Sequence, residues 1–390
     1  MKKLWCLVLI AIGAALLIAA APNSEPETLY LYERNGLYGY MNQCGYIVIR
    51  PQFTAALQFR EGLAAISRTA ENTVEYINEK GVPVISNHKF YINWSTGCRS
   101  FHNKIAIVAT EPNKPSGCIL IDQTGDLITN HVFRDNVSDF NEGYACYSTG
   151  YAGFPPQPGY ERMVKYSYLN TSGETATEQW FDEARDFSNG LAIVGRWKDG
   201  DIQFVSGDKR FAVIDRDFQF VTDYRFEEAG SYHDGLLPVM AGGKWGYIDG
   251  QGNQVIACRY DSDDWFGDRI RFNQLRPYLR DADWKGAHDF SEGLAAVYQD
   301  GKWGYIDTSG AMVIPPQFEY ARPFSEGLAA VIQDGKWGFI DQTGKIAIPA
   351  QYAFVLNFQD GLAVVSDSDG KYKYYINKTG QVIRLRAKRS

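Results

Sequence analysis

The chain has 390 residues, of which 45% are hydrophobic, 14% aromatic and 22% charged, and its formal net charge is -7. This balance excludes a disordered polyelectrolyte and a multi-pass membrane protein. Because 46 acidic residues outnumber 39 basic ones, the sequence offers no clustered positive potential for phosphate groups, and we expect no nucleic-acid binding.

The N-terminal segment, residues 1–21, has the layout of a secretory signal peptide. Lys2 and Lys3 precede an apolar run that ends in three alanines, and this order is typical of such signals. We therefore predict a signal helix and export to the periplasm, the cell envelope or the medium. The alternative is an uncleaved anchor, because the run is long enough to span a bilayer and Pro22 is unusual after a cleavage site. Membrane contact is expected only through this segment.

A polar linker, residues 22–27, leads into nine related units that we predict over residues 28–390. Trp303 and Trp337 are 34 positions apart, and such a period marks tandem units that bury their faces against their neighbours. The first strand of each unit begins at Leu29, Leu63, Ile105, Tyr144, Leu191, Leu236, Leu294, Leu328 and Leu362. The second strand begins at Tyr38, Val74, Cys118, Tyr166, Phe211, Trp245, Trp303, Trp337 and Lys373.

The fifth position of the second strand is Asp or Asn in every unit: Asn42, Asn78, Asp122, Asn170, Asp215, Asp249, Asp307, Asp341 and Asn377. A glycine follows three residues later in eight units, and Phe218 takes its place in the fifth. An Asx side chain can accept a backbone hydrogen bond from two residues further on, and the glycine can adopt positive φ. These carboxylates therefore indicate turns rather than catalysis or metal binding.

The run Lys-Trp-Gly-Tyr-Ile-Asp at 302–307, the Asp-x-x-Gly turn and the Phe-x-x-Gly-Leu-Ala phrase resemble the WG-repeat (WG containing repeat, KWG-type) family, which is mostly bacterial. The resemblance is close over Gly243–Gly252 and Gly301–Gly361, and it is degenerate in units two to five. It implies a β-rich repeat scaffold, often exported, that binds rather than catalyses. No catalytic residue is carried over, because the family motif is itself structural.

The second strand is apolar on both faces, which predicts a central strand covered on both sides. Pro51, Pro315 and Pro349 lie in the third strand, and proline belongs at sheet edges. We predict core positions for the tryptophans rather than sugar-stacking platforms, because other units fill the slot with Tyr, Val, Cys or Phe. The glycine after each tryptophan indicates close backbone packing. The structural repeat residues are Trp245, Gly246, Trp303, Gly304, Trp337 and Gly338.

Insertions at 87–100, 148–165 and 261–287 separate these strands, and insertions in repeat arrays usually project from one rim, where they can form a binding face. We predict binding roles for the aromatic residues in them: Trp94, Tyr151, Phe154, Tyr160, Trp265, Phe266 and Trp284. The acidic stretch from Asp261 to Asp283 lacks the ligand spacing of a calcium loop. No metal and no cofactor are predicted.

Catalytic signatures are absent from the sequence. The five histidines are scattered without an HExxH pattern, and there is no G-x-S-x-G elbow or phosphate-binding glycine loop. Five cysteines lie after the signal segment, and spacing alone assigns no disulfide among Cys44, Cys98, Cys118, Cys146 and Cys258. Cys118 and Cys146 occupy apolar strand positions, which predicts buried thiols.

The predicted fold is an all-β tandem array of about nine three-stranded antiparallel meanders, stacked in an elongated or curved form. A β-propeller is the alternative, for which the stretch Glu319–Phe324 could supply a fourth strand. The predicted function is an exported, non-catalytic scaffold that binds a protein or glycan at the cell envelope. Two alternatives stay open: an envelope hydrolase with acids such as Asp264 and Asp283 in the insertions, or a purely structural spacer.

Overall fold

The computed structural model describes residues 28–69, 73–86, 90–91, 100–110, 117–133, 137–149, 164–197, 209–263, 286–367, 369 and 372–386. Over these residues the regular elements are strands, which form nine antiparallel sheets in chain order. The all-β prediction is confirmed. In this part of the chain, no helix has the length and apolar character needed to span a bilayer. The predicted signal helix 1–21 and linker 22–27 lie outside the described residues.

Each sheet is one unit, numbered 1 to 9, and its strands keep the predicted order. The first strands are β1 (Leu29–Arg34), β5 (Leu63–Ser67), β8 (Ile105–Ala109), β10 (Tyr144–Thr149), β13 (Leu191–Trp197), β16 (Leu237–Ala241), β19 (Leu294–Gln299), β23 (Leu328–Gln333) and β26 (Leu362–Ser366). The second strands are β2 (Leu37–Asn42), β6 (Glu75–Asn78), β9 (Cys118–Asp122), β11 (Lys165–Asn170), β14 (Lys209–Asp215), β17 (Lys244–Ile248), β20 (Lys302–Asp307), β24 (Lys336–Asp341) and β27 (Lys373–Asn377).

The third position in the sheet is a full strand in five units and a set of isolated bridges in the others. The full strands are β3 (Ile47–Phe53), β7 (Pro83–Ile85), β18 (Gln254–Tyr260), β21 (Met312–Phe318) and β25 (Ile346–Tyr352). A short inner strand also pairs with the first strand in four units: β4 (Ala55–Ala56), β12 (Glu183–Ala184), β15 (Glu228–Ala229) and β22 (Tyr320–Ala321). The simple three-stranded meander therefore needs this correction: the segment between units adds a fourth, inner strand.

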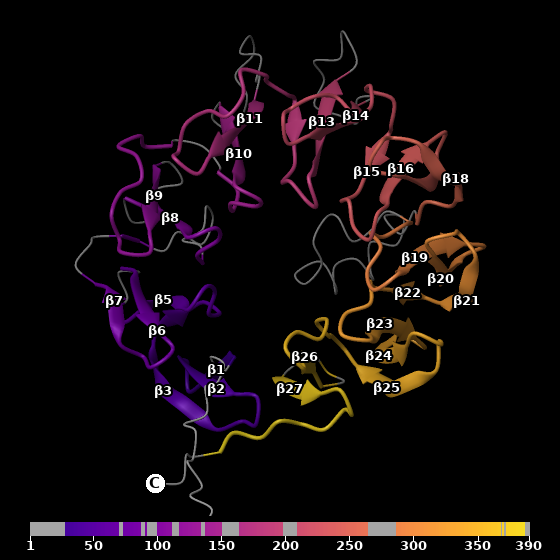
Figure 1. Ribbon diagram of the computed structural model, residues 1–390. Coiled ribbons are helices and arrows are strands. Elements are labelled where there is room, and N and C mark those ends of the chain that lie inside the picture. Colours follow the sequence, from indigo (N-terminus) through magenta and orange to yellow (C-terminus); the bar gives the residue numbers. More distant parts are fainter. Residues whose placement is uncertain are drawn as a thin grey trace, which may run out of the picture.

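The nine sheets stand in a closed ring with the short inner strands toward the centre and the third strands outside (Figure 1). The sequence analysis favoured an open stack, and the structure instead has the arrangement of a β-propeller. Gly45 of unit 1 packs against Ile383 of unit 9, and a parallel bridge joins Tyr46 to Arg386. The last unit thus buries its face against the first, so the array has no exposed end.

The core lies between neighbouring sheets, because the second strand is apolar on both faces. Trp303 and Tyr305 of β20 are completely buried, and they pack with Trp337 of the next unit. Between Trp303 and Tyr305 the pairing with β21 shifts register. At this point a Cβ on Gly304 would lie 2.6 Å from the carbonyl oxygen of Ile314, so only glycine allows the two backbones to approach so closely.

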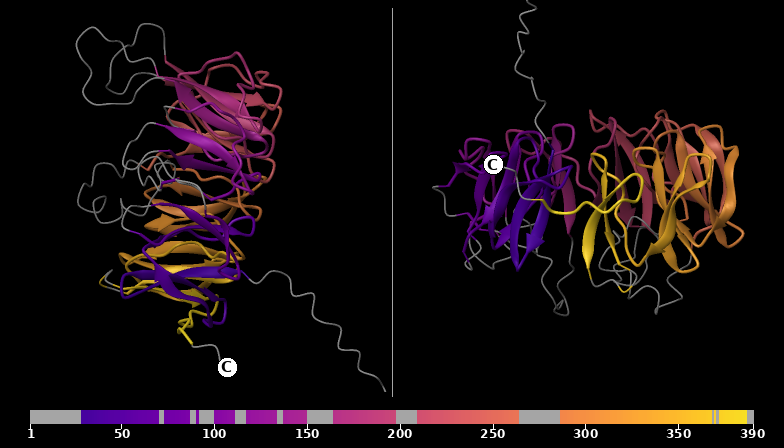
Figure 2. Two further views of the ribbon diagram at one scale, coloured as in Figure 1. Left: turned by 90° about the vertical axis from the view of Figure 1, so that its left-hand side faces the viewer. Right: turned by 90° about the horizontal axis from the view of Figure 1, so that it is seen from below.

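The ring has two faces, which appear in the edge views of Figure 2. One face, called the turn face, carries two turns of each unit: the outer turn from the second to the third strand and the inner turn that precedes the first strand. The two turns share this face because the start of the first strand pairs with the end of the second, as Leu294 does with Asp307. The opposite face, called the hairpin face, carries the hairpins between first and second strands, where Gln299 pairs with Lys302. The described residues that border the insertions 148–165 and 261–287 lie at the hairpin face, since Thr149 pairs with Lys165 and the N–H of Asp261 donates to the carbonyl of Tyr298. The insertion 87–100 differs, because Phe101 after it directly precedes the inner turn of unit 3 at the turn face.

Candidate functional site

The outer turns are held by the Asp or Asn side chains. Oδ1 of Asp307 accepts hydrogen bonds from the backbone N–H groups of Ser309, at 2.9 Å, and Ala311, at 3.0 Å. The Ser309 hydroxyl also donates to this oxygen and lowers the pKa of the exposed carboxyl. Gly310 and Phe218 both have positive φ at their turns. The interpretation of these carboxylates as turn residues is confirmed.

A second recurring contact joins five of the units to the next one through a tyrosine that sequence reasoning missed. The hydroxyl of Tyr305 in β20 donates to the carbonyl of Arg322 in unit 8 at 2.8 Å. Burial raises the pKa of Tyr305 far above its ordinary value. The same bond runs from Tyr40 to Leu57, from Tyr168 to Arg185, from Tyr247 to His288 and from Tyr375 to Leu31. The signal was a tyrosine at the third position of the second strand in six units.

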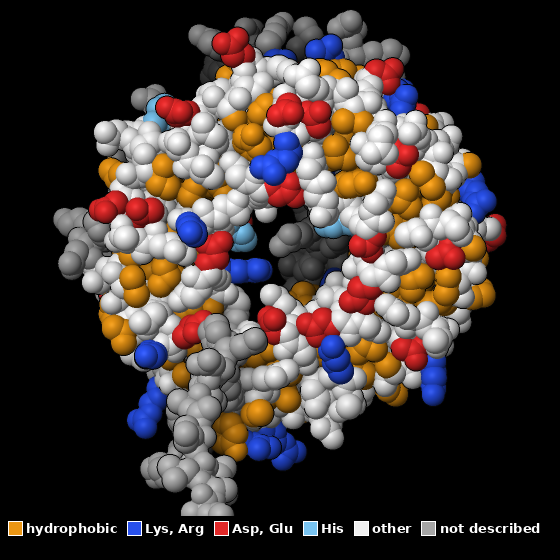
Figure 3. Space-filling model, viewed as in Figure 1, with side chains coloured by type: hydrophobic (Ala, Val, Ile, Leu, Met, Phe, Trp, Pro, Cys, Tyr) orange, Lys and Arg blue, Asp and Glu red, His pale blue; other side chains and the backbone are white. Residues whose placement is uncertain are grey.

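A third contact links the inner turns around the ring. Glu292 and Gly293 both have positive φ, and Oε2 of Glu292 accepts the backbone N–H of Gly327 in the next unit at 2.9 Å. Glu326 accepts the N–H of Gly361 in the same way. Equivalent bonds join Glu61 to Lys104, Asn103 to Gly143, Glu142 to Gly190 and Asp234 to Gly293. Acidic side chains gather around the central opening in Figure 3. The inner-turn acids named in this paragraph are structural ties between units.

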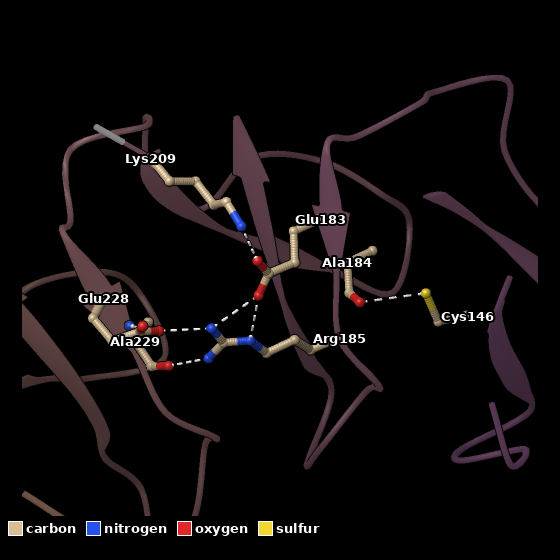
Figure 4. A network of polar contacts seen from close by, with 7 residues as sticks. All are labelled: Cys146, Glu183, Ala184, Arg185, Lys209, Glu228 and Ala229. Atoms are coloured by element: carbon tan, nitrogen blue, oxygen red, sulfur yellow. Dashed lines mark hydrogen bonds and ion pairs between the residues drawn. The ribbon is translucent and has the colours of Figure 1, made fainter. Parts of the chain in front are cut away.

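A network of charges connects units 5 and 6 (Figure 4). Nη2 of Arg185 lies 3.0 Å from Oε1 of Glu183 and 2.6 Å from Oε1 of Glu228, and Lys209 also binds Glu183. Burial alone would raise the pKa of Glu183, but Arg185 and Lys209 together hold it below its ordinary value. Because the four charges are mutually paired, the network is a joint between units rather than a ligand site.

Ser188 and His233 superficially resemble a nucleophile and its base. Oγ of Ser188 lies 3.2 Å from Nε2 of His233, yet the same hydroxyl can donate to the carbonyl of Tyr232 at 3.1 Å. Ser291 and Ser325, at the equivalent position of their units, donate to the corresponding carbonyl of the next unit. The serine therefore belongs to the repeat's set of contacts between units, and the pair supplies no activated nucleophile.

A buried polar cluster surrounds His288 in unit 7. Its Nε2 lies 3.4 Å from the hydroxyl oxygen of Tyr320, and its ring packs against Trp303. Burial, with the nearby Arg322 guanidinium, lowers the pKa of His288 to about 3. Nε1 of Trp303 donates to Oδ2 of Asp263 at 2.9 Å. Asp263 thus anchors the start of the acidic stretch to the core, whereas Asp264–Asp283 lies outside the described residues.

A cavity lies where the inner loop of unit 9 meets unit 1. Its volume is about 520 Å³, which is within the usual range for small-molecule sites. Its wall has polar side chains and an apolar part: Tyr30, Gln58, Arg322, Ser325, Asn357, Gln359, Asp360 and Tyr375 carry polar groups, and Leu356, Phe358, Leu362 and Val364 are apolar. Sequence reasoning did not single out any of these residues.

The predicted binding aromatics cannot be placed, because Trp94, Tyr151, Phe154, Tyr160, Trp265, Phe266 and Trp284 lie outside the described residues. The structural repeat tryptophans, in contrast, are in the core: Trp245, Trp303 and Trp337 are 1%, 0% and 2% exposed. Gly246 and Gly338 repeat the close approach seen at Gly304.

The described cysteines are all free thiols. Cys118 and Cys146 are buried as predicted, and the thiol of Cys146 donates to the carbonyl of Ala184 in unit 5 (Figure 4). Burial raises the pKa of the Cys146 thiol, so the thiolate is disfavoured. Within the described ranges, no group of three or more His, Cys, Asp or Glu is arranged to hold a metal ion.

These contacts define a repeat protein whose units close into a ring of small β-sheets. The profile described as WG containing repeat matches residues 38–68, 166–195, 211–245, 245–262, 282–303, 303–337 and 337–372, a little more than half of the chain. The chain therefore belongs to the WG-repeat family, as its motifs indicate.

Among solved structures, the chain is similar to Hsv2p of Kluyveromyces lactis, with 12% identity and a TM-score of 0.38, over 71% of this chain and 90% of that one. It is also similar to virginiamycin B lyase of Staphylococcus aureus, with 12% identity and a TM-score of 0.34, over 71% of this chain and 93% of that one. The comparison with curated proteins gave no match.

Proposed function

We propose that this WG-repeat protein is an exported, non-catalytic binding scaffold whose hairpin face holds a protein or glycan partner at the cell envelope. The observation that carries the proposal is the common origin of two insertions, 148–165 and 261–287. The described residues that border them, among them Thr149, Lys165 and Asp261, lie at the same face of the ring. Loops that leave one face of a rigid scaffold can form a single binding surface.

The chemistry of the ring supports binding rather than catalysis. The outer-turn and inner-turn carboxylates described above are occupied by backbone N–H groups of their own turn or of the next unit. The charges around Arg185 are mutually paired, and the Ser188 hydroxyl belongs to a recurring contact. The three insertions contain eleven aromatic residues, seven of which are the predicted binding candidates, and aromatic side chains often dominate interfaces. Export rests on the signal-like layout of residues 1–21.

The test removes the largest insertion without disturbing the ring. Residues 264–285 are replaced by a Gly-Ser linker, which keeps Asp263 and its bond to Trp303. A second variant carries Trp265→Ala, Phe266→Ala and Trp284→Ala. We expect both variants to lose capture of the envelope protein or glycan that the parent retains, by about tenfold or more.

The matched control is Trp180→Ala, which removes an exposed aromatic from the outer strand region of unit 4. This control should capture the partner like the parent, and all variants should unfold at nearly the same temperature. Unchanged capture by the loop replacement would remove this insertion from the proposed surface.

A further inference from the structure

The contacts that join consecutive units are incomplete where unit 9 meets unit 1. In units 2 to 9 an inner segment and an inner turn precede the first strand, whereas the described part of unit 1 begins at Thr28, directly before β1. At β1 the Gln58 side chain supplies hydrogen bonds to the inner edge of the first strand. Its amide donates to the carbonyl of Leu29, and its Oε1 accepts the N–H of Leu31 at 3.1 Å.

Among the described residues, Asp360, the inner-turn acid of unit 9, has no N–H donor like those that bind its counterparts in other units. Thr28 stands where the next turn would present a glycine N–H, and among the described residues nothing donates to the Asp360 carboxylate. Its backbone carbonyl, in contrast, accepts hydrogen bonds from Tyr30 and from Gln43. The carboxylate of Asp360 is therefore available to a ligand.

Other features leave polar groups of the inner loop of unit 9 without partners in the described chain. Unit 8 has Phe339 in place of the tyrosine, so no hydroxyl reaches the inner loop of unit 9 from this position. In that loop, Oδ1 of Asn357 is buried and has no hydrogen-bond partner in the described chain. Gln359 occupies the position at which Ser291 and Ser325 tie their units together, and its side-chain amide makes no such bond within the described residues.

These groups converge on the cavity of about 520 Å³. Gln58, Asn357, Gln359 and Asp360 line it, together with Leu356, whose side chain is 42% exposed. The guanidinium of Arg322 also borders the cavity, but it is stacked on the Trp337 ring at 4.9 Å. The wall thus combines amides and one carboxylate with an aliphatic patch, and it presents no cluster of positive charge.

This lining selects the chemistry of a ligand. An apolar ligand would leave the amides and the carboxylate desolvated without partners, which costs about 1–3 kcal/mol for each group. An anion would meet the Asp360 carboxylate. Side-chain amides both donate and accept, and a carboxylate accepts two hydrogen bonds, so together they match neighbouring hydroxyl groups. The C–H face of a sugar ring can pack on Leu356.

We propose that the cavity between the inner loop of unit 9 and β1 is a binding site for a neutral sugar, separate from the insertions of the hairpin face. Asn357, Gln359 and Asp360 bind its hydroxyl groups. Two departures from the repeat border this cavity in the described part of the chain: the described part of unit 1 starts directly at β1, and Phe339 of unit 8 replaces the tyrosine.

The test uses the full chain and ligand-observed NMR with cellobiose, maltose and N,N′-diacetylchitobiose as probes. We expect saturation transfer to at least one of these sugars. The double variant Asn357→Ala, Gln359→Ala should bind it at least about tenfold more weakly, because two hydrogen-bonding groups are lost. Leu356→Trp, which fills the cavity and keeps the polar groups, should abolish binding.

The control is Leu127→Trp, which places the same ring on an exposed position of unit 3 and should bind like the parent. The proposal is wrong if none of the three sugars binds, or if Leu356→Trp binds as well as the parent. It is also wrong if sugar binding disappears on replacing residues 264–285 while Leu356→Trp retains it, because the sugar site then belongs to the hairpin face. Retention by the 264–285 replacement, with loss in Leu356→Trp, supports the cavity whatever becomes of the hairpin-face proposal.

Discussion

Single residues in this ring are constrained mainly by the neighbouring unit. Gly304 shows the effect within a sheet, where the Ile314 carbonyl occupies the space of a side chain. Gly310 shows it between sheets, because a Cβ there would lie 3.2 Å from the Ile256 side chain of the preceding unit. A tryptophan beside such a glycine fills the space between sheets, so the Trp-Gly pair is one packing device.

His288 gives the residue-scale prediction, because it is neutral and buried in the folded ring. With a pKa of about 3 in the folded chain against an ordinary 6.5, its contribution to stability is complete above pH 6.5. As the pH falls from 6.5 toward 3, His288 becomes protonated in the unfolded chain but stays neutral in the folded chain. The free energy of unfolding should then fall by roughly 1.4 kcal/mol per pH unit from this group.

The measurement is urea unfolding of the parent and of His288→Gln between pH 7 and pH 4.5. The variant should lose this part of the pH dependence, although its stability at pH 7 is also lower because the packing against Trp303 changes. Glu183 also contributes to the pH dependence, because its pKa is lowered in the folded chain. Its contribution to the free energy of unfolding is lost as the pH falls through and below its ordinary pKa. This loss is the same in the parent and in the variant. An identical slope in parent and variant would contradict the assignment to His288.

At the scale of elements, the second strand lies in the middle of its own sheet and also contacts the sheet of the next unit. Its tryptophan or substitute fills space, its glycine admits the third strand, and its tyrosine bonds a carbonyl of the following unit. The nearly continuous apolar pattern, with apolar residues on both faces, predicted the burial of this strand. The tyrosine bond could not be predicted from the strand alone, because its acceptor is a backbone carbonyl of another unit.

Tyr40 and Tyr38 of β2 offer a matched test of this bond. The Tyr40 hydroxyl donates to the carbonyl of Leu57 at 2.6 Å, and the Tyr40 side chain is fully buried. Tyr40→Phe should lower the free energy of unfolding by about 1–2 kcal/mol, because a buried carbonyl loses its donor. Tyr38→Phe removes a hydroxyl from the same strand and should change it by less than about 0.5 kcal/mol. Equal effects in chemical denaturation would contradict a special role for Tyr40.

At the scale of the whole molecule, the sequence predicts the units but not the ring. Strand types and turns recur in every unit, so residues such as Asp307 and Gly310 identify them reliably. Closure depends on the sum of small rotations between sheets, and its contacts, such as Gly45 with Ile383, join opposite ends of the chain. The candidate cavity lies beside two positions, Thr28 and Phe339, at which the sequence differs from the repeat pattern. Both differences are visible in the aligned units. Their effect could not be predicted, because it depends on contact between the first and last units.

The ring closure gives the last prediction. Removing residues 381–390 deletes Ile383, whose side chain packs on Gly45, and Arg386, whose carbonyl accepts the N–H of Ile47 at 3.0 Å. The bonds from Tyr375 to Leu31 and from Tyr30 and Gln43 to Asp360 stay, so unit 1 keeps some ties to unit 9. We expect the free energy of unfolding to fall by about 1–3 kcal/mol, from one partly buried aliphatic side chain and the lost backbone bonds.

Small-angle X-ray scattering should show a larger radius of gyration as the ring opens, whereas removing only residues 387–390 should leave both the radius of gyration and the free energy of unfolding unchanged. If both truncations scatter and unfold alike, the C-terminal segment does not close the ring, and the contacts of Tyr30, Gln43 and Tyr375 hold units 9 and 1 together.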